Sequence, residues 1–171
     1  MMLTAHSLVT VKPAGLADAV ALAEVFRLTW RSTYAAMLPH SHIENKIKRR
    51  GVAWWRSIIR SCDTLSVIKF DGRVVGYATC GRSRNSTRHK GEIYELYILP
   101  QYQGVGLGEL LFEACRHNLD EQCLRGLIVW CLADNVQAIE FYERRGGAAV
   151  ASCIERIGGE NIRKIAFCWD D

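Results

Sequence analysis

The chain has 171 residues, of which 22 are Lys or Arg and 18 are Asp or Glu, so its formal net charge is +4. Hydrophobic residues make up 49% and charged residues 23%, as in soluble globular proteins, and this composition excludes an intrinsically disordered chain. The length predicts a single domain over residues 1–171, because one core commonly serves roughly 100–200 residues. So small a positive excess does not predict nucleic-acid binding, but it is compatible with a small anionic ligand.

The seven cysteines include no Cys-x-x-Cys pair, and neither they nor the pair His40 and His42 have the spacing of a zinc site, so we expect no metal. The first residues lack the basic and apolar regions of a secretion signal. No apolar run approaches the ~18 residues that a membrane span needs. We therefore expect free thiols, a reduced cytoplasmic compartment and no membrane contact.

The first third of the chain predicts a strand followed by helices. Leu8–Lys12 alternates between apolar and polar residues and is typical of a strand. Apolar residues at helical spacing predict a helix over 14–30 and a second helical region over 40–61. Gly51 predicts a break or bend in the second region, because glycine weakens a helix interior by roughly 1 kcal/mol relative to alanine.

A hairpin is predicted next. The segments 64–70 and 73–80 are β-branched and apolar, and Asp71-Gly72 between them favours a tight primed turn. A polar loop over 81–90 then leads into a strand over 92–99.

The second half alternates strands and helices. The remaining predicted elements are a helix that starts near Leu107, an apolar strand over 127–132, a helix over 136–145 and a closing hairpin made of 148–157 and 162–169. The order βααββ–βα–βα–ββ predicts an α/β fold, a mixed sheet with helices on its faces.

The turn before the helix near Leu107 is rich in glycine and reads Gln103-Gly104-Val105-Gly106-Leu107-Gly108. Glycines allow close backbone approach, and the unbonded amides of a helix start attract anions, so a phosphate or diphosphate is the natural ligand. A P-loop is excluded because no Lys-Ser or Lys-Thr follows the glycines. A dinucleotide fingerprint is excluded because its third glycine or alanine is absent. The structural alternative is a loop that uses glycine only to turn.

This turn, Gln103-x-x-Gly106-x-Gly108 after Tyr97-Ile98-Leu99-Pro100, resembles the acetyl-CoA motif of the GNAT N-acetyltransferase superfamily. The segment from Asn135 to Tyr142 and Gly146 resembles that family's asparagine-to-tyrosine helix. The segment from Thr29 to Pro39 and the closing hairpin are also similar to family members. The resemblance covers nearly the whole chain in the right order, and it implies a mostly antiparallel sheet whose parallel fourth and fifth strands splay apart to hold coenzyme A.

The resemblance also implies a set of ligand-binding residues. The coenzyme-binding residues would be Gln103 with the amides of Gly104, Val105, Gly106, Leu107, Gly108 and Glu109 for the diphosphate, the backbone of Leu96, Tyr97 and Ile98 for the pantetheine arm, and Asn135 and Tyr142 near the thioester. An amide at or beside Ile98 would polarise the thioester carbonyl. Trp30 and Tyr34 would form walls of the acceptor site.

Two side chains are candidates for proton transfer. Tyr142 would protonate the leaving thiolate, although an aromatic residue at helical spacing also fits a packing role. Glu92 occupies the position of a catalytic glutamate in some family members, although a strand glutamate also fits a solvated surface. Strand alternation predicts that Glu95 faces the opposite side of the sheet. Trp130 stands where other members carry a glutamate, and ordered water is an alternative base.

The sequence therefore predicts an acetyl-CoA-dependent N-acetyltransferase that moves the acetyl group directly to a primary amine, either a small molecule or a peptide amino group. A non-catalytic acyl-CoA-binding module on the same fold is the alternative. A second alternative is a nucleotide-binding protein of another kind. The closing hairpin leaves an exposed edge that is compatible with a homodimer.

Overall fold

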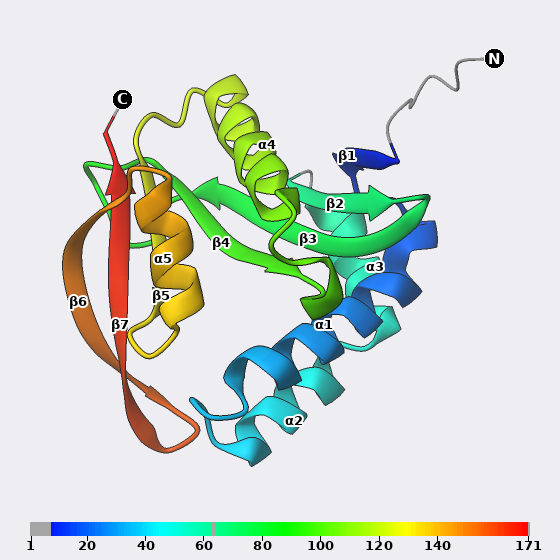
Figure 1. Cartoon of the computed structure of the whole chain (residues 1–171), viewed down its shortest axis with the longest axis horizontal. Helices are drawn as coiled ribbons and strands as arrows, with labels where there is room; N and C mark the ends of the chain where they lie inside the picture. Colours follow the sequence, from blue (N-terminus) through cyan, green and yellow to red (C-terminus); the bar gives the residue numbers. More distant parts are fainter. Residues whose placement is uncertain (1–7, 63, 171) are drawn as a thin grey trace.

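A seven-stranded mixed sheet runs through the molecule, and helices cover parts of both of its faces (Figure 1). The computed structural model describes residues 8–62 and 64–170. The strands are β1 (Val9–Pro13), β2 (Leu65–Phe70), β3 (Arg73–Arg82), β4 (Gly91–Ile98), β5 (Leu127–Leu132), β6 (Ala148–Ile157) and β7 (Glu160–Trp169). The helices are α1 (Ala19–Tyr34), α2 (His40–Arg49), α3 (Val52–Ser61), α4 (Leu107–Glu121) and α5 (Val136–Arg144), with short 3₁₀ turns at η1 (Leu16–Asp18) and η2 (Pro100–Tyr102).

The strand order is β1-β2-β3-β4-β5-β7-β6, and β4 and β5 are the parallel neighbours in it. The predicted α/β class and element order are confirmed. The second helical region is divided as expected, because Gly51 adopts an extended conformation and is the N-cap of α3. The first helix ends four residues later than predicted. In the added turn the Tyr34 ring packs edge-on against Trp30, one turn earlier, at a centroid distance of 4.9 Å.

The turn between β2 and β3 shows why the sequence specifies a hairpin there. Asp71 and Gly72 both have positive φ, 50° and 75°, as a primed two-residue turn requires. Phe70 lies opposite Arg73 in the ladder, so the turn follows directly on the last pair.

The two faces of the central strands bury different helices. On one face Tyr77 of β3 packs against Trp55 of α3, with ring centroids 5.0 Å apart. On the other face the sulfur of Cys80 lies 3.9 Å from the backbone oxygen of Cys115 in α4. Helix α5 joins the α4 side, where Phe141 packs against Phe112. The cysteines in the described part of the chain are free.

Two irregularities of β4 matter for function. Its pairing with β3 skips Tyr94, because Ile93 lies opposite Cys80 and Glu95 lies opposite Thr79, which is the pattern of a β-bulge. Its parallel pairing with β5 ends after Ile93. Beyond that point β4 and β5 diverge, so the β5-facing edge of residues 94–98 has no strand partner among the described residues.

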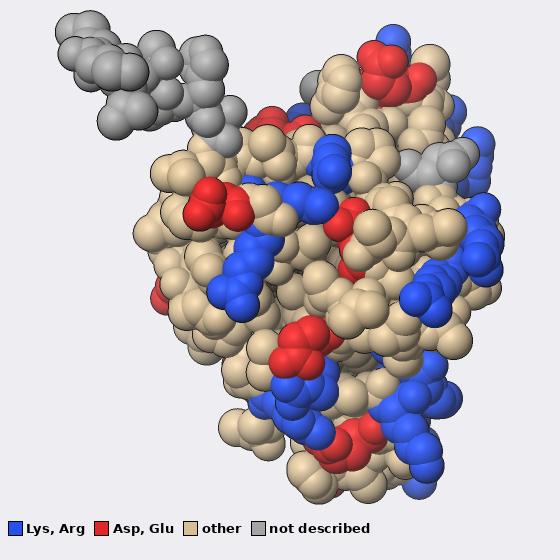
Figure 2. Space-filling model, turned by 90° about the vertical axis from the view of Figure 1, so that its right-hand side faces the viewer, with Lys and Arg blue, Asp and Glu red and all other residues tan. Residues whose placement is uncertain are grey.

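The surface is mixed in charge. Figure 2 shows Lys and Arg side chains near Asp and Glu side chains on the side of the molecule that lies to the right in Figure 1. Two ion pairs join separate elements, Glu44–Arg31 between α2 and α1 and Asp18–Lys69 between η1 and β2, and Glu24–Arg27 lies within α1. Among the helices of the described residues, none has the length and apolar character needed to cross a membrane. At the sheet edge, Val150 and Ile154 of β6 are exposed.

Candidate active site

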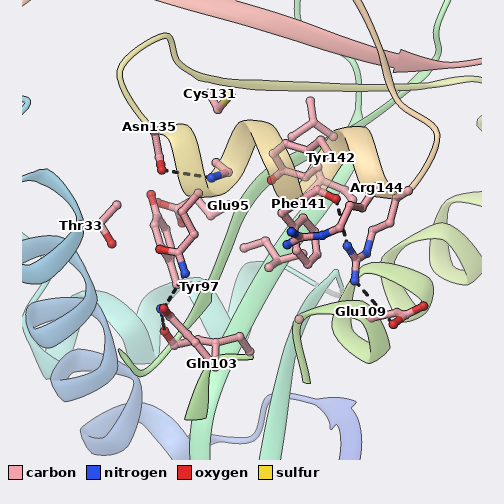
Figure 3. Close-up of a pocket in the computed structure, with 18 of the residues that line it drawn as sticks. Thr33, Glu95, Tyr97, Gln103, Glu109, Cys131, Asn135, Phe141, Tyr142 and Arg144 are labelled. Carbon is pink, nitrogen blue, oxygen red and sulfur yellow. Dashed lines mark hydrogen bonds and ion pairs between the residues drawn. The ribbon is translucent and has the colours of Figure 1, made fainter. Parts of the chain in front are cut away.

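A cavity of about 400 Å³ occupies the gap where β4 and β5 diverge. Figure 3 shows side chains from four directions around it: Thr33 on α1, Glu95 and Tyr97 on β4, Glu109 at the start of α4, and Tyr142 on α5. The cavity therefore connects the α1 side of the sheet with the glycine-rich turn. The predicted site residues that line it are Tyr34, Leu96, Tyr97, Ile98, Gln103, Gly104, Gly106, Gly108, Glu109, Asn135 and Tyr142.

The turn before α4 presents a row of free backbone amides. The first amide hydrogen bond at this helix start is made by Leu110, whose N lies 3.2 Å from the oxygen of Gly106. The amides of residues 104–109 precede it and have no acceptor within the described parts of the chain. Gly104 and Gly106 have φ of 77° and 86°, a region that favours glycine, and a Cβ at either position would meet no atom within 4 Å. Unbonded amides at a helix start are groups that attract anions, as the sequence predicts for this turn.

Gln103 fixes this turn to its surroundings. Its Nε2 donates to the backbone oxygen of Ile98 at 2.8 Å, and its Oε1 accepts from Nε2 of Gln137 at 2.7 Å. The side chain thereby connects the turn to the end of β4 and to the first turn of α5. Within the predicted motif, Gln103 holds the glycine-rich turn against both walls of the cavity.

Asn135 is the N-cap of α5 and also lines the cavity. Its Oδ1 accepts a hydrogen bond from the amide of Ala138 at 3.2 Å, as expected of a helix N-cap (Figure 3). The side-chain NH₂ group has no acceptor among the described residues. It is therefore available to a ligand that enters the cavity.

Tyr142 lies two turns further along α5 and is 7% exposed. It packs against Phe112, Phe167 and Trp169, so the packing role is real. Burial raises the pKa of Tyr142 well above its usual value of 10.0, so the phenol carries its proton at neutral pH. The described residues offer no hydrogen-bond partner to its hydroxyl. A protonated phenol that lines the cavity can donate to a ligand.

Cys131 of β5 also lines the cavity and is almost fully buried. Burial raises the pKa of this thiol to about 11. Because the thiolate is the nucleophilic form of cysteine, a thiol that stays protonated is a poor nucleophile at neutral pH.

Of the two glutamates on β4, it is Glu95 that lines the cavity, whereas the sequence predicted Glu92 as the candidate base. Glu95 lines the cavity and forms an ion pair with Arg50, whose Nη1 lies 2.6 Å from Oε1. Glu92 is 1% exposed and lies outside the cavity lining. Its carboxylate accepts from the backbone N of Arg84 at 2.9 Å and from Nη2 of the same residue at 2.7 Å.

The expectation that Glu92 and Glu95 face opposite sides of the sheet is wrong. The bulge at Tyr94 adds a residue between them, so Glu92 lies opposite Gly81 and Glu95 opposite Thr79. Gly81 and Thr79 are two residues apart on β3 and share a face, and their partners share it too. Simple alternation cannot show an inserted residue.

The predicted acceptor walls are placed one behind the other. Tyr34 lines the cavity, and its hydroxyl oxygen lies 2.7 Å from that of Tyr97. Burial raises the pKa of Tyr34 to about 12, so this pair is uncharged at neutral pH. Trp30 is not among the lining residues and packs behind Tyr34. Val105 and Leu107, which were also predicted, are not among the lining residues: the Val105 side chain is exposed and that of Leu107 is buried in the core.

Several lining residues were not predicted. Gln137, Phe141 and Arg144 of α5, and Arg145 directly after it, also line the cavity. Their mutual spacing of three or four residues is the signal that could have grouped them on one stripe of the helix, distinct from that of Asn135 and Tyr142. Glu95 gave no such signal, because its place depends on the bulge.

Comparison with known proteins agrees with this geometry. The model of the "Acetyltransferase (GNAT) family" matches residues 22–147. YuaI, an uncharacterized N-acetyltransferase of Bacillus subtilis strain 168, is 28% identical over 166 residues, which cover 96% of this chain and 94% of YuaI.

Solved structures share the fold. The PaiA N-acetyltransferase from Thermoplasma acidophilum, solved in complex with coenzyme A, has a TM-score of 0.74 at 18% identity, covering 92% of this chain and 97% of its own. YncA from Salmonella typhimurium, solved with acetyl-CoA, has a TM-score of 0.70 at 20% identity, covering 96% and 94%. With a family model that spans most of its length, the chain belongs to the GNAT family of acetyltransferases.

Proposed function

We propose that this protein transfers the acetyl group of acetyl-CoA to a primary amine by direct attack in a ternary complex. The observation that carries the proposal is the row of six free amides, 104–109, at the mouth of a cavity between two diverging strands. Such amides bind a diphosphate, and a gap beside an unpaired strand edge accommodates a long, amide-containing chain. In acetyl-CoA a diphosphate is followed by such a chain, the pantetheine arm, which ends in the acetyl thioester.

The proposed contacts follow the coenzyme along its length. The diphosphate would bind the amides of residues 104–109, where the absence of Cβ atoms at Gly104 and Gly106 leaves open space. The pantetheine arm would pair with the free edge of β4 at Leu96, Tyr97 and Ile98. The thioester would then lie near Asn135 and Tyr142. The coenzyme A and acetyl-CoA complexes of the structural relatives support this assignment.

Proton transfer is assigned to two residues that line the cavity. As the amine nitrogen forms its bond to the acetyl carbon, the carbon–sulfur bond breaks and the sulfur leaves with the electron pair. Tyr142 would give its proton to that sulfur, since its raised pKa ensures that the phenol still carries the proton when the carbon–sulfur bond breaks. An amide at or beside Ile98 would stabilise the developing oxyanion.

The amine must lose a proton, and Glu95 is the carboxylate placed to receive it, directly or through water. Glu95 lines the cavity, whereas Glu92 is enclosed by its contacts with Arg84. We therefore assign the base to Glu95 rather than to Glu92. Direct transfer is favoured over an acetyl-cysteine intermediate because the pKa of Cys131 is raised.

The acceptor enters from the α1 side in this scheme. Tyr34, Tyr97 and Trp130 offer aromatic surface there, and Glu95 offers negative charge to a cationic amine. A small molecule and a peptide amino group both fit this description. The homodimer and the cytoplasmic location stay predictions.

A ligand panel tests the proposal. At about 100 times its dissociation constant, a ligand stabilises the folded state by about 2.7 kcal/mol, so acetyl-CoA and coenzyme A should raise the melting temperature by several degrees. ATP and NAD should not. An amine panel read by thiol release then tests turnover. Stabilisation by ATP or NAD alone would contradict the proposal, and coenzyme binding without turnover on any amine would favour the non-catalytic module.

A further inference from the structure

Arg145 follows α5 and carries a guanidinium group toward the start of α4. Its side chain is 15% exposed, and its Cζ lies 3.6 Å from the centre of the Phe141 ring. The same ring lies against the glycine-rich turn, because a Cβ at Gly108 would be 3.0 Å from it. The guanidinium is therefore separated from the free amides by about one aromatic ring.

The hydrogen bonds of this guanidinium are incomplete. Of its five N–H donors, one on Nη1 donates to the backbone oxygen of Phe141 at 2.9 Å. Nε is buried and has no acceptor within the described residues. Nη2 lies 3.6 Å from Oε2 of Glu109, an ion pair that is longer than a hydrogen bond. Buried donors usually have acceptors. The described residues do not supply enough of them to this guanidinium, so a ligand is the natural source of the missing acceptors.

Glu109 is a weak resting partner. It is 62% exposed and lies in the first turn of α4, where the helix dipole favours a negative charge. The carboxylate thus stands beside the position expected to receive an anion. A phosphate there would repel Glu109 and compete with it for Arg145.

We propose that Arg145 binds a phosphate group of the coenzyme, and that Glu109 is the partner it exchanges for that phosphate. This inference rests on the proposed function. A guanidinium donates two parallel hydrogen bonds to a phosphate, which the long contact with Glu109 does not provide. Coenzyme A offers two sources of this chemistry, the diphosphate and the 3′-phosphate of the ribose.

Arg145→Met tests the proposal because the methionine retains apolar packing on Phe141 and removes the donors. Dissociation constants would be measured for coenzyme A, 3′-dephospho-coenzyme A and pantetheine, the last of which has no phosphate. Arg145→Lys keeps the charge without the fork of donors. Arg125→Met removes one exposed positive charge outside the cavity lining and is the charge-matched control.

We expect Arg145→Met to weaken coenzyme A binding on the order of 10- to 50-fold, as the loss of charge-assisted hydrogen bonds implies. Pantetheine binding should stay unchanged, Arg145→Lys should recover part of the loss, and Arg125→Met should have little effect. An equal loss for 3′-dephospho-coenzyme A assigns the contact to the diphosphate, and a loss confined to coenzyme A assigns it to the 3′-phosphate. Unchanged coenzyme A binding, or an equal loss for pantetheine or in Arg125→Met, overturns the proposal.

Glu109→Gln provides an independent test that leaves Arg145 in place. Removing the competing carboxylate should tighten coenzyme A binding several-fold, and the gain should shrink when Arg145 is also replaced, which a double-mutant cycle measures. Weaker binding in Glu109→Gln, or the same gain in both backgrounds, overturns the exchange. If the unaltered protein binds neither form of the coenzyme, the proposed function itself fails.

Discussion

Glu95 of β4 and Arg50, which follows α2, form a mostly buried ion pair at the cavity, with 2.6 Å between Oε1 and Nη1. The Arg50 guanidinium also lies over the rings of Phe26 and Trp54, so packing holds the pair from both sides. If Glu95 accepts the proton of the amine, Glu95→Gln should lower kcat on the order of 100-fold and leave acetyl-CoA affinity unchanged. Steady-state kinetics with a fixed amine would measure both effects.

Glu92→Gln is the matched control for that substitution. Glu92 is buried and held by Arg84, so its replacement should lower the free energy of unfolding by about 1–3 kcal/mol. Folded Glu92→Gln protein should turn over close to the normal rate. The opposite pattern, with turnover lost in Glu92→Gln and kept in Glu95→Gln, would return the base to Glu92.

Tyr142→Phe should separate chemistry from coenzyme binding. The substitution removes the hydroxyl and keeps the ring that packs on Phe112 and Trp169. We expect kcat to fall by about 10²- to 10⁴-fold, the usual loss of a general acid. The rise in melting temperature with acetyl-CoA should persist. Normal turnover in Tyr142→Phe would limit this residue to packing.

Gly106→Asp should abolish stabilisation by acetyl-CoA. It would place a side chain and a negative charge among the amides that receive the diphosphate, at a residue with φ of 86°. Gly159→Asp is a suitable control, because Gly159 has φ of 88°, is surrounded by open space and lies in the turn between β6 and β7. Both variants carry a backbone strain of roughly 1–2 kcal/mol. A ligand-induced shift that survives in Gly106→Asp would argue against the amide site.

Cys131→Ala should retain most of the turnover, since the raised pKa of this thiol argues against a covalent role. Mass spectrometry of protein quenched during turnover should find no enzyme-bound acetyl group. Cys115→Ala, a buried cysteine of α4 outside the cavity lining, controls for packing loss. An acetylated Cys131 that forms and decays at the rate of turnover would replace direct attack by a two-step mechanism.

The sequence predicted the elements well because their signals are local. Asp71-Gly72 specifies the turn of the first hairpin, Gly51 divides the second helical region, and Asn135 caps α5. The glycine-rich turn was readable for the same reason, since positive φ at Gly104 and Gly106 demands glycine whatever surrounds them.

The parts that sequence could not give depend on pairing between distant segments. The bulge at Tyr94 is a property of the pairing between β4 and β3. It places Glu92 and Glu95 on the same face of the sheet, where simple alternation predicts opposite faces. The partner of Glu95, Arg50, is 45 residues away along the chain, so no local pattern joins the two. Likewise, whether Trp30 or Tyr34 reaches the cavity depends on how α1 packs on the sheet.

The short pairing between β4 and β5 has a dynamic consequence. Three residue pairs, from Gly91 with Leu127 to Ile93 with Val129, join a half-sheet of β1–β4 to a half-sheet of β5–β7. A ligand that hydrogen-bonds along the open edge of β4 would extend the contact between the two half-sheets beyond these three residue pairs. Slower amide hydrogen exchange near this seam would then accompany binding, and the coenzyme would serve as a structural member of the sheet as well as a reactant.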